Sequence, residues 1–173
     1  MRKFLILGSA ALALTMTSAC TNKLAPQNAP TTTDAGPAVP PGVDPADVEL
    51  TELPAMQADL IAKAGSDTVY FGTDEYQLDA SSQATLAAQA QWMLANPRVR
   101  ASIEGHADER GTREYNMALG ERRANAARDY LQAQGVPADR LLVTSWGKER
   151  PVAAGSDETA WAQNRRAVTV IVR

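Results

Sequence analysis

The sequence predicts an α/β two-layer sandwich, with helices on one face of a mixed sheet, in the C-terminal part of the chain. β-Branched and aromatic segments alternate with segments of helical periodicity in the order βαβαβ(α)β. The connections between the strands are long enough for helical crossovers. Aromatic residues make up only 5% of the 173 residues, so the core is small and one compact domain is the limit.

The N-terminal region has the composition of a targeting segment followed by a tether. A basic start precedes an apolar run at residues 4–14, which is too short to span a bilayer, and small residues then lead to Cys20. This arrangement resembles the lipobox of bacterial lipoproteins, with residues 1–19 as signal peptide and Cys20 lipidated; the alternative is a free thiol in a cleaved precursor. Residues 20–48 are rich in proline and poor in large apolar side chains, which predicts a flexible tether.

The charge of the chain argues against one class of partner. The formal net charge is −3, and it becomes −5 when the two basic residues of the signal peptide are removed. A nucleic-acid-binding protein needs a basic surface, so no nucleic-acid partner is expected. The single cysteine permits no disulfide bond within the chain.

A helical lead-in is expected before the domain, at residues 49–65. Its apolar residues approximate helical spacing, and we expect the helix to begin after Pro54 and to pack loosely. The domain itself is expected at residues 66–173. Its predicted strands are 67–71, 99–104, 141–145 and 166–172, and its predicted helices are 80–95 with Asp79 as N-cap, 113–134 with Thr112 as N-cap, and a short one through Trp161.

The longest predicted helix places a charge on the face that should meet the core. At about 100° per residue, Asn116, Leu119 and Arg123 share this face. A buried arginine stays charged and needs a carboxylate or a bound anion. Two interpretations of Arg123 are open, a structural ion pair and a ligand site. Asp108, in the polar loop just before the helix, supplies a free carboxylate.

Three motifs carry a resemblance to a known family. The chain has GHADERG at residues 105–111, N-x-x-L-G-x-x-R-A at residues 116–124, and NRR at residues 164–166. These motifs resemble the OmpA-like peptidoglycan-binding domain family, over roughly residues 69–172. The resemblance implies the two-layer fold and a non-catalytic binding function that needs no cofactor and no metal.

The ligand that the resemblance implies is the peptide stem of peptidoglycan, bound through meso-diaminopimelate. The free end of that residue carries an ammonium and a carboxylate on one carbon. Asp108 would accept hydrogen bonds from the ammonium, and Arg123 would hold the carboxylate in a bidentate fork. For Asp74 and Arg165, bracing of the loops is an equal alternative to ligand contact. The predicted peptidoglycan-binding residues are Phe71, Gly72, Thr73, Asp74, Asp108, Asn116, Leu119, Arg123 and Arg165.

The sequence leaves three classes of function open. The first is a tether that is lipid-anchored in the outer membrane, faces the periplasm and binds peptidoglycan, with a role in envelope integrity and in outer-membrane constriction during division. The second is a module whose main ligand is a protein, since the resemblance implies TolB, a periplasmic β-propeller, and other Tol proteins as partners. The third is a wall enzyme, which is disfavoured because His106 is the only histidine and lacks a nucleophile or metal partner.

Overall fold

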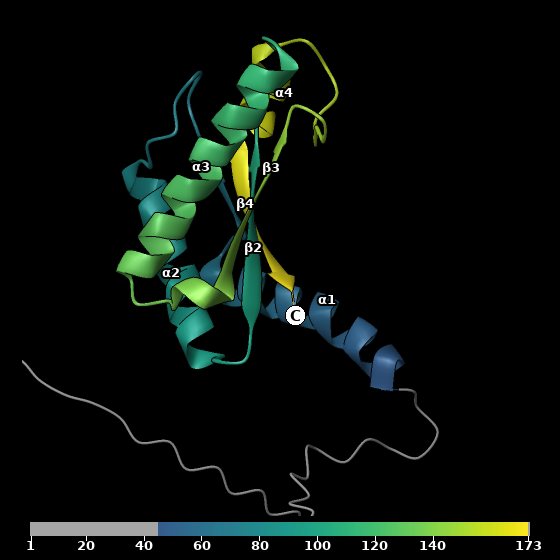
Figure 1. The fold of residues 1–173 in the computed structure, drawn as a ribbon, viewed down its shortest axis with the longest axis vertical. Helices are drawn as coiled ribbons and strands as arrows, with labels where there is room; N and C mark the ends of the chain where they lie inside the picture. Colours follow the sequence, from purple (N-terminus) through teal and green to yellow (C-terminus); the bar gives the residue numbers. More distant parts are fainter. Residues whose placement is uncertain (1–44, 173) are drawn as a thin grey trace, which may run out of the picture. The chain divides into compact units, whose positions relative to one another are not determined.

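The computed structural model describes residues 45–172, in which a four-stranded sheet has the order β1-β4-β2-β3 (Figure 1). β4 is antiparallel to both β1 and β2, whereas β2 and β3 are parallel. The mixed sheet confirms the predicted fold class. The strands are β1 Thr68–Tyr70, β2 Arg100–His106, β3 Leu141–Gly147 and β4 Arg166–Val172.

The two long helices of the domain, α2 and α3, lie on the same side of the sheet (Figure 1). Both predicted N-caps are confirmed, because Asp79 Oδ1 accepts a hydrogen bond from the backbone N of Ser82 at 2.7 Å and Thr112 Oγ1 accepts one from Tyr115 N at 3.2 Å. The helices are α1 Pro45–Ala64, α2 Ala80–Ala95, α3 Arg113–Ala133 and α4 Glu158–Asn164, with a 3-10 helix, η1, at Ala138–Arg140.

The core lies between one face of the sheet and these helices. Alternate residues of the strands point into it, so that small and branched side chains of β2 and β4 meet the apolar stripes of α2 and α3. A very close approach joins Gly105 in β2 to Gly120 in α3. A Cβ placed on Gly105 would lie 1.8 Å from the carbonyl oxygen of Gly120, so the helix rests directly on the strand. Core residues include Val69, Leu86, Met93, Ala101, Ile103, Ala124, Leu131, Ala167 and Ile171.

The bounds of several elements differ from the prediction, among them β1, which is one residue shorter at each end, and β3, which ends at Gly147 instead of residue 145. Helix α1 begins at Pro45, four residues before the predicted lead-in, and contains Pro54 in its interior instead of starting after it. Strand β2 continues to His106 instead of ending at Glu104, because Gly105 and His106 still pair with β3 across a bulge. His106 therefore belongs to a strand end and not to the loop.

The prediction that the lead-in helix packs loosely was wrong. Leu60 is fully buried in the core. The side-chain amide of Gln57 donates to the carbonyl oxygen of Thr169 at 3.0 Å and accepts from the backbone N of Ile171 at 2.8 Å. Strand β1 is too short to pair with this part of β4. Gln57 instead forms hydrogen bonds with the backbone groups of β4 that β1 leaves unpaired.

Several predictions concern residues outside the described range. The signal peptide at residues 1–19, the lipidated Cys20 and the tether as far as residue 44 all lie there. Within residues 45–172, none of the helices combines the length and the apolar character that crossing a membrane requires.

Candidate functional site

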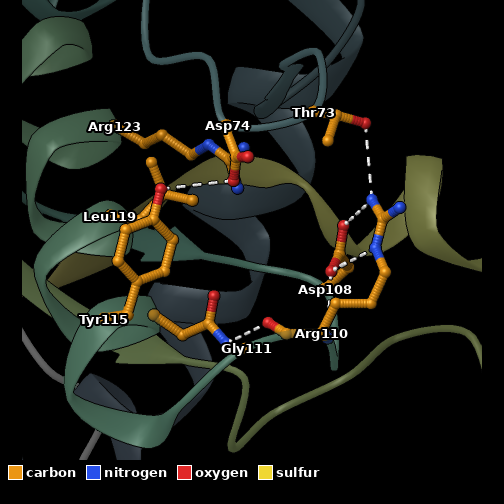
Figure 2. Close-up of a pocket in the computed structure, with 9 residues that line it drawn as sticks. Thr73, Asp74, Asp108, Arg110, Gly111, Tyr115, Leu119 and Arg123 are labelled. Carbon is orange, nitrogen blue, oxygen red and sulfur yellow. Dashed lines mark hydrogen bonds and ion pairs between the residues drawn. The ribbon is translucent and has the colours of Figure 1, made fainter.

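A pocket of about 260 Å³ lies where the loop after β1, the loop after β2 and the start of α3 meet (Figure 2). Six of the nine predicted site residues line it, and the remaining three, Phe71, Gly72 and Arg165, do not. The lining residues are Thr73, Asp74, Asp108, Arg110, Gly111, Tyr115, Asn116, Leu119 and Arg123.

Arg123 is fully buried and connects the two loops from inside. Its guanidinium donates to three backbone carbonyl oxygens: from Nε to Glu75 at 2.8 Å, from Nη1 to His106 at 2.8 Å, and from Nη2 to Gly72 at 3.0 Å. Burial lowers its pKa to about 10, which keeps the group charged at neutral pH. The structural ion pair is not found, because no carboxylate in residues 45–172 lies within ion-pair distance of Arg123. Three of the five N–H donors are thus used by the fold.

Asp108 is not the free carboxylate that the sequence predicted. The side chain of Arg110 binds both of its oxygens, with Nε 3.1 Å from Oδ1 and Nη2 2.6 Å from Oδ2, and the backbone N of Arg110 also donates to Oδ1. Burial raises the pKa of Asp108, but the hydrogen bonds from Arg110 outweigh burial and the pKa lies below its ordinary value. Asp108 is therefore a charged and already paired acceptor.

Arg165 braces the site from behind the pocket. It is buried, its Nε donates to the carbonyl oxygen of Phe71 at 3.0 Å, and its Nη2 lies 2.6 Å from Glu158 Oε1. Its Nη1 lies 3.5 Å from Oδ2 of Asp108. These contacts brace the loops, and ligand contact by Arg165 stays a prediction. Phe71 itself is buried and, with Gly72, lines a neighbouring pocket of about 370 Å³.

The mouth of the pocket is formed by exposed side chains of the first loop and α3. Asp74 has a φ of 57°, an uncommon conformation for a residue other than glycine, and its Oδ1 accepts a hydrogen bond from the Tyr115 hydroxyl at 3.3 Å. Asn116 donates from Nδ2 to the carbonyl oxygen of Arg110 at 2.7 Å and so fixes the second loop to the helix. Leu119 supplies an apolar wall. The hydrogen bond from Tyr115 gives Asp74 a bracing contact, and its contact with the ligand stays a prediction.

Arg110 is one of three lining residues that sequence reasoning missed, the others being Gly111 and Tyr115. Its guanidinium points at Asp108 and toward Thr73, whose hydroxyl lies 3.4 Å from Nη2 (Figure 2). Its Cζ lies 4.2 Å from the centre of the Trp161 ring, within cation–π range. The hydrogen bond to Asp108 raises the pKa of Arg110, and 39% of its side chain is exposed. The sequence signal that could have identified Arg110 is its position two residues after Asp108.

Comparison with known families agrees with this geometry. A family model described as the OmpA family matches residues 70–165, more than half of the chain. The chain belongs to the OmpA family. The OmpA-family match supports the expectation of a binding protein without catalytic activity.

Two relatives and one solved structure are similar to a large part of this OmpA-family chain. A peptidoglycan-associated lipoprotein of Rhizobium meliloti is 54% identical over 118 residues, and one of Agrobacterium fabrum is 53% identical over 118 residues. Each match covers 68% of this chain and 66% of the relative, so the chain spans just under two thirds of their length. The crystal structure of the peptidoglycan-associated lipoprotein from Burkholderia pseudomallei is 45% identical, with a TM-score of 0.61 over 62% of this chain and 92% of that one.

His106 has a structural position in this OmpA-family domain. It is buried, and its Nδ1 has no hydrogen-bond partner in the described part of the chain. Burial, followed by the charges of Arg166 and Arg150, lowers its pKa to about 4. No group of three or more histidine, cysteine or acidic side chains that could hold a metal lies within residues 45–172.

The lowered pKa of His106 predicts a loss of stability in mild acid. An unfolded histidine binds a proton near pH 6.5, whereas His106 in the folded chain does so near pH 4, so the unfolded state takes up more protons between these values. We expect the free energy of unfolding to fall by about 2 kcal/mol from pH 7 to pH 5. Urea unfolding at both pH values measures this loss. The His106→Gln variant should lack it, and an equal loss in the variant would assign the effect to other groups.

Proposed function

We propose that the chain is an outer-membrane lipoprotein that anchors the membrane to the cell wall by binding the peptidoglycan stem non-covalently. The observation that carries this proposal is the charge pattern of the pocket. Two acidic side chains, Asp74 and Asp108, and two basic ones, Arg110 and Arg123, surround a space of about 260 Å³. A ligand end that carries both an ammonium and a carboxylate matches such a pocket, whereas a ligand of one sign would face repulsion from half of it.

The free end of meso-diaminopimelate has this pattern on a single carbon. We place its ammonium at Asp108, which the fold keeps charged, and its carboxylate toward the arginines that line the pocket. Leu119 offers an apolar wall for the methylene chain. The names of the relatives, peptidoglycan-associated lipoproteins, support this choice of ligand.

The membrane end of the proposed tether is a lipidated Cys20. Two or more acyl chains give stable membrane attachment, which a single chain does not. Between Cys20 and α1 lie residues 21–44, rich in proline, which would span roughly 75 Å if extended at about 3.1 Å per residue. The domain would then face the periplasm and reach the wall while the lipid stays in the outer membrane.

A protein partner, TolB, is part of the same proposal. Tyr115 lies at the mouth of the pocket and Tyr76 lies in the first loop, between β1 and α2, and both are about half exposed. Tyrosine is enriched in protein interfaces, so these side chains suit a docking surface that overlaps the wall site. With other Tol proteins, such a switchable contact would serve envelope integrity and constriction of the outer membrane during division.

Calorimetric titration of the full chain in detergent with a stem peptide containing meso-diaminopimelate tests the proposal. We expect binding, and we expect Asp108→Asn to weaken it at least about thirtyfold, because loss of a buried, hydrogen-bonded charge typically costs about 2–5 kcal/mol. Asp139→Asn, an exposed change in η1, is the matched control and should bind as the wild type does. The melting temperature of each variant reports whether it is folded.

Two outcomes would contradict the wall tether. Binding to TolB without binding to the stem would make the protein partner the main ligand. Equal binding by Asp108→Asn and the wild type would move the ligand away from this pocket.

A further inference from the structure

Arg110 occupies the position that we assign to the ligand's ammonium. Its guanidinium covers both oxygens of Asp108, at 3.1 and 2.6 Å. A ligand that brings a cation to Asp108 must therefore displace a cation that belongs to the chain. Once it is displaced, the charged guanidinium of Arg110 needs a new partner.

We infer that Arg110 determines selectivity for a zwitterionic ligand end through an exchange of ion pairs. The ligand's ammonium replaces the guanidinium at Asp108, and the released guanidinium takes the ligand's carboxylate. This inference rests on the proposed function and adds the residue that discriminates between stems. A stem with lysine in place of meso-diaminopimelate has the ammonium but lacks the carboxylate, so it would release Arg110 without giving it a partner.

The contacts of Arg110 suit an exchange of this kind. Its side chain is 39% exposed, while that of Asp108 is 9% exposed, so the arginine has room to move and the aspartate has not. The Trp161 ring and the Thr73 hydroxyl lie against the guanidinium and would keep it beside the pocket after it leaves Asp108. Arg165 stays 3.5 Å from Asp108, which keeps the carboxylate ionised during the exchange.

The exchange produces specificity by penalising the wrong ligand. An ammonium alone gains one charge-assisted pair at Asp108 and loses another of comparable strength, so little binding energy remains. A zwitterionic ligand end breaks the ion pair between Arg110 and Asp108 but forms two new ones, one with each of these residues. Discrimination of this type depends on the competing group within the protein and not on a tighter contact with the preferred ligand.

Two stem tripeptides that differ only at the third residue, meso-diaminopimelate or lysine, test the inference. Each is titrated calorimetrically into the full chain in detergent, for the wild type and for Arg110→Gln, Arg110→Lys and Arg113→Gln. We expect Arg110→Gln to bind the lysine stem about tenfold more tightly than the wild type does, without a gain for the meso-diaminopimelate stem. Arg110→Lys keeps the charge but loses the bidentate geometry of the guanidinium. Its affinity for the lysine stem should lie between those of the wild type and Arg110→Gln.

Arg113→Gln is the matched control because Arg113 is three residues away but pairs with Glu149 and does not line the pocket. Its selectivity should equal that of the wild type. The ratio of the two affinities is insensitive to partial unfolding, since both stems meet the same sample. An unchanged ratio in Arg110→Gln would overturn the inference, as would an equal weakening for both stems, which would make Arg110 a structural brace.

Failure of the proposed function has a different signature. If the wild type binds neither stem, wall binding through this pocket is wrong and the inference falls with it. If the wild type prefers meso-diaminopimelate and Arg110→Gln keeps that preference in full, only the inference is wrong.

Discussion

A Gly105→Ala chain should lose about 4 kcal/mol of unfolding free energy, although the change adds a single methyl group. The new Cβ would lie 1.8 Å from the carbonyl oxygen of Gly120 and 3.1 Å from the Cβ of Ala124. The first contact is with helix backbone, which has no rotamer to change, so α3 must move off the sheet by more than 1 Å. Such a shift also disturbs His106, whose carbonyl oxygen holds Arg123.

Equilibrium unfolding in urea, monitored by circular dichroism, measures this loss. Gly72→Ala is the matched control: the Cβ on Gly72 would meet only the end of the Glu75 side chain, at 2.5 Å from Oε2, and that side chain is exposed and flexible. We expect this control to change the unfolding free energy by less than about 1 kcal/mol. A similar, small effect of both substitutions would show that α3 and β2 are not in the tight contact described above.

The sequence predicted most of the fold because local patterns specify most of its elements. The stripe of α3 and the cap at Thr112 are visible within one segment, and the structure places both as expected. Helix α1 was less predictable, since Pro54 suggests a helix start and nothing local indicates a buried role for Gln57. Its amide pairs with an edge of β4 that is distant by more than 100 positions in the chain. Only the three-dimensional arrangement reveals that this edge is open.

The functional site, like the fold, was predictable from local sequence only in part. The helical spacing brought Asn116, Leu119 and Arg123 to one face, and the structure places all three in the pocket wall. The partners of the charges were not predictable, because carbonyl oxygens of the first loop and of the end of β2 satisfy Arg123 and a neighbouring arginine satisfies Asp108. A sequence shows which side chains carry charge but not which of them the fold has already paired.

Arg123→Met should combine a loss of about 3 kcal/mol in unfolding free energy with a loss of stem binding of at least about thirtyfold. Methionine fills similar space but has no donor, so the carbonyl oxygens of Gly72, Glu75 and His106 lose the hydrogen bonds that the guanidinium donates, although that of Gly72 still accepts from the backbone N of Glu75 at 3.3 Å. Each lost hydrogen bond costs about 1 kcal/mol or more. Since these carbonyls belong to the loop that carries Asp74 and to the end of β2, directly before the loop that carries Asp108, the pocket loses its geometry along with its cation.

Arg122→Met is the matched control for this prediction. Arg122 is the next residue on α3, is exposed, and lies 5.7 Å from the Tyr76 ring, so its loss should change the unfolding free energy by less than about 0.5 kcal/mol. Urea unfolding and calorimetric titration with the meso-diaminopimelate stem are performed on both variants. If Arg123→Met is destabilised but binds the stem as the wild type does, the guanidinium serves only the loops. If it is as stable as Arg122→Met, the three hydrogen bonds do not hold the site together.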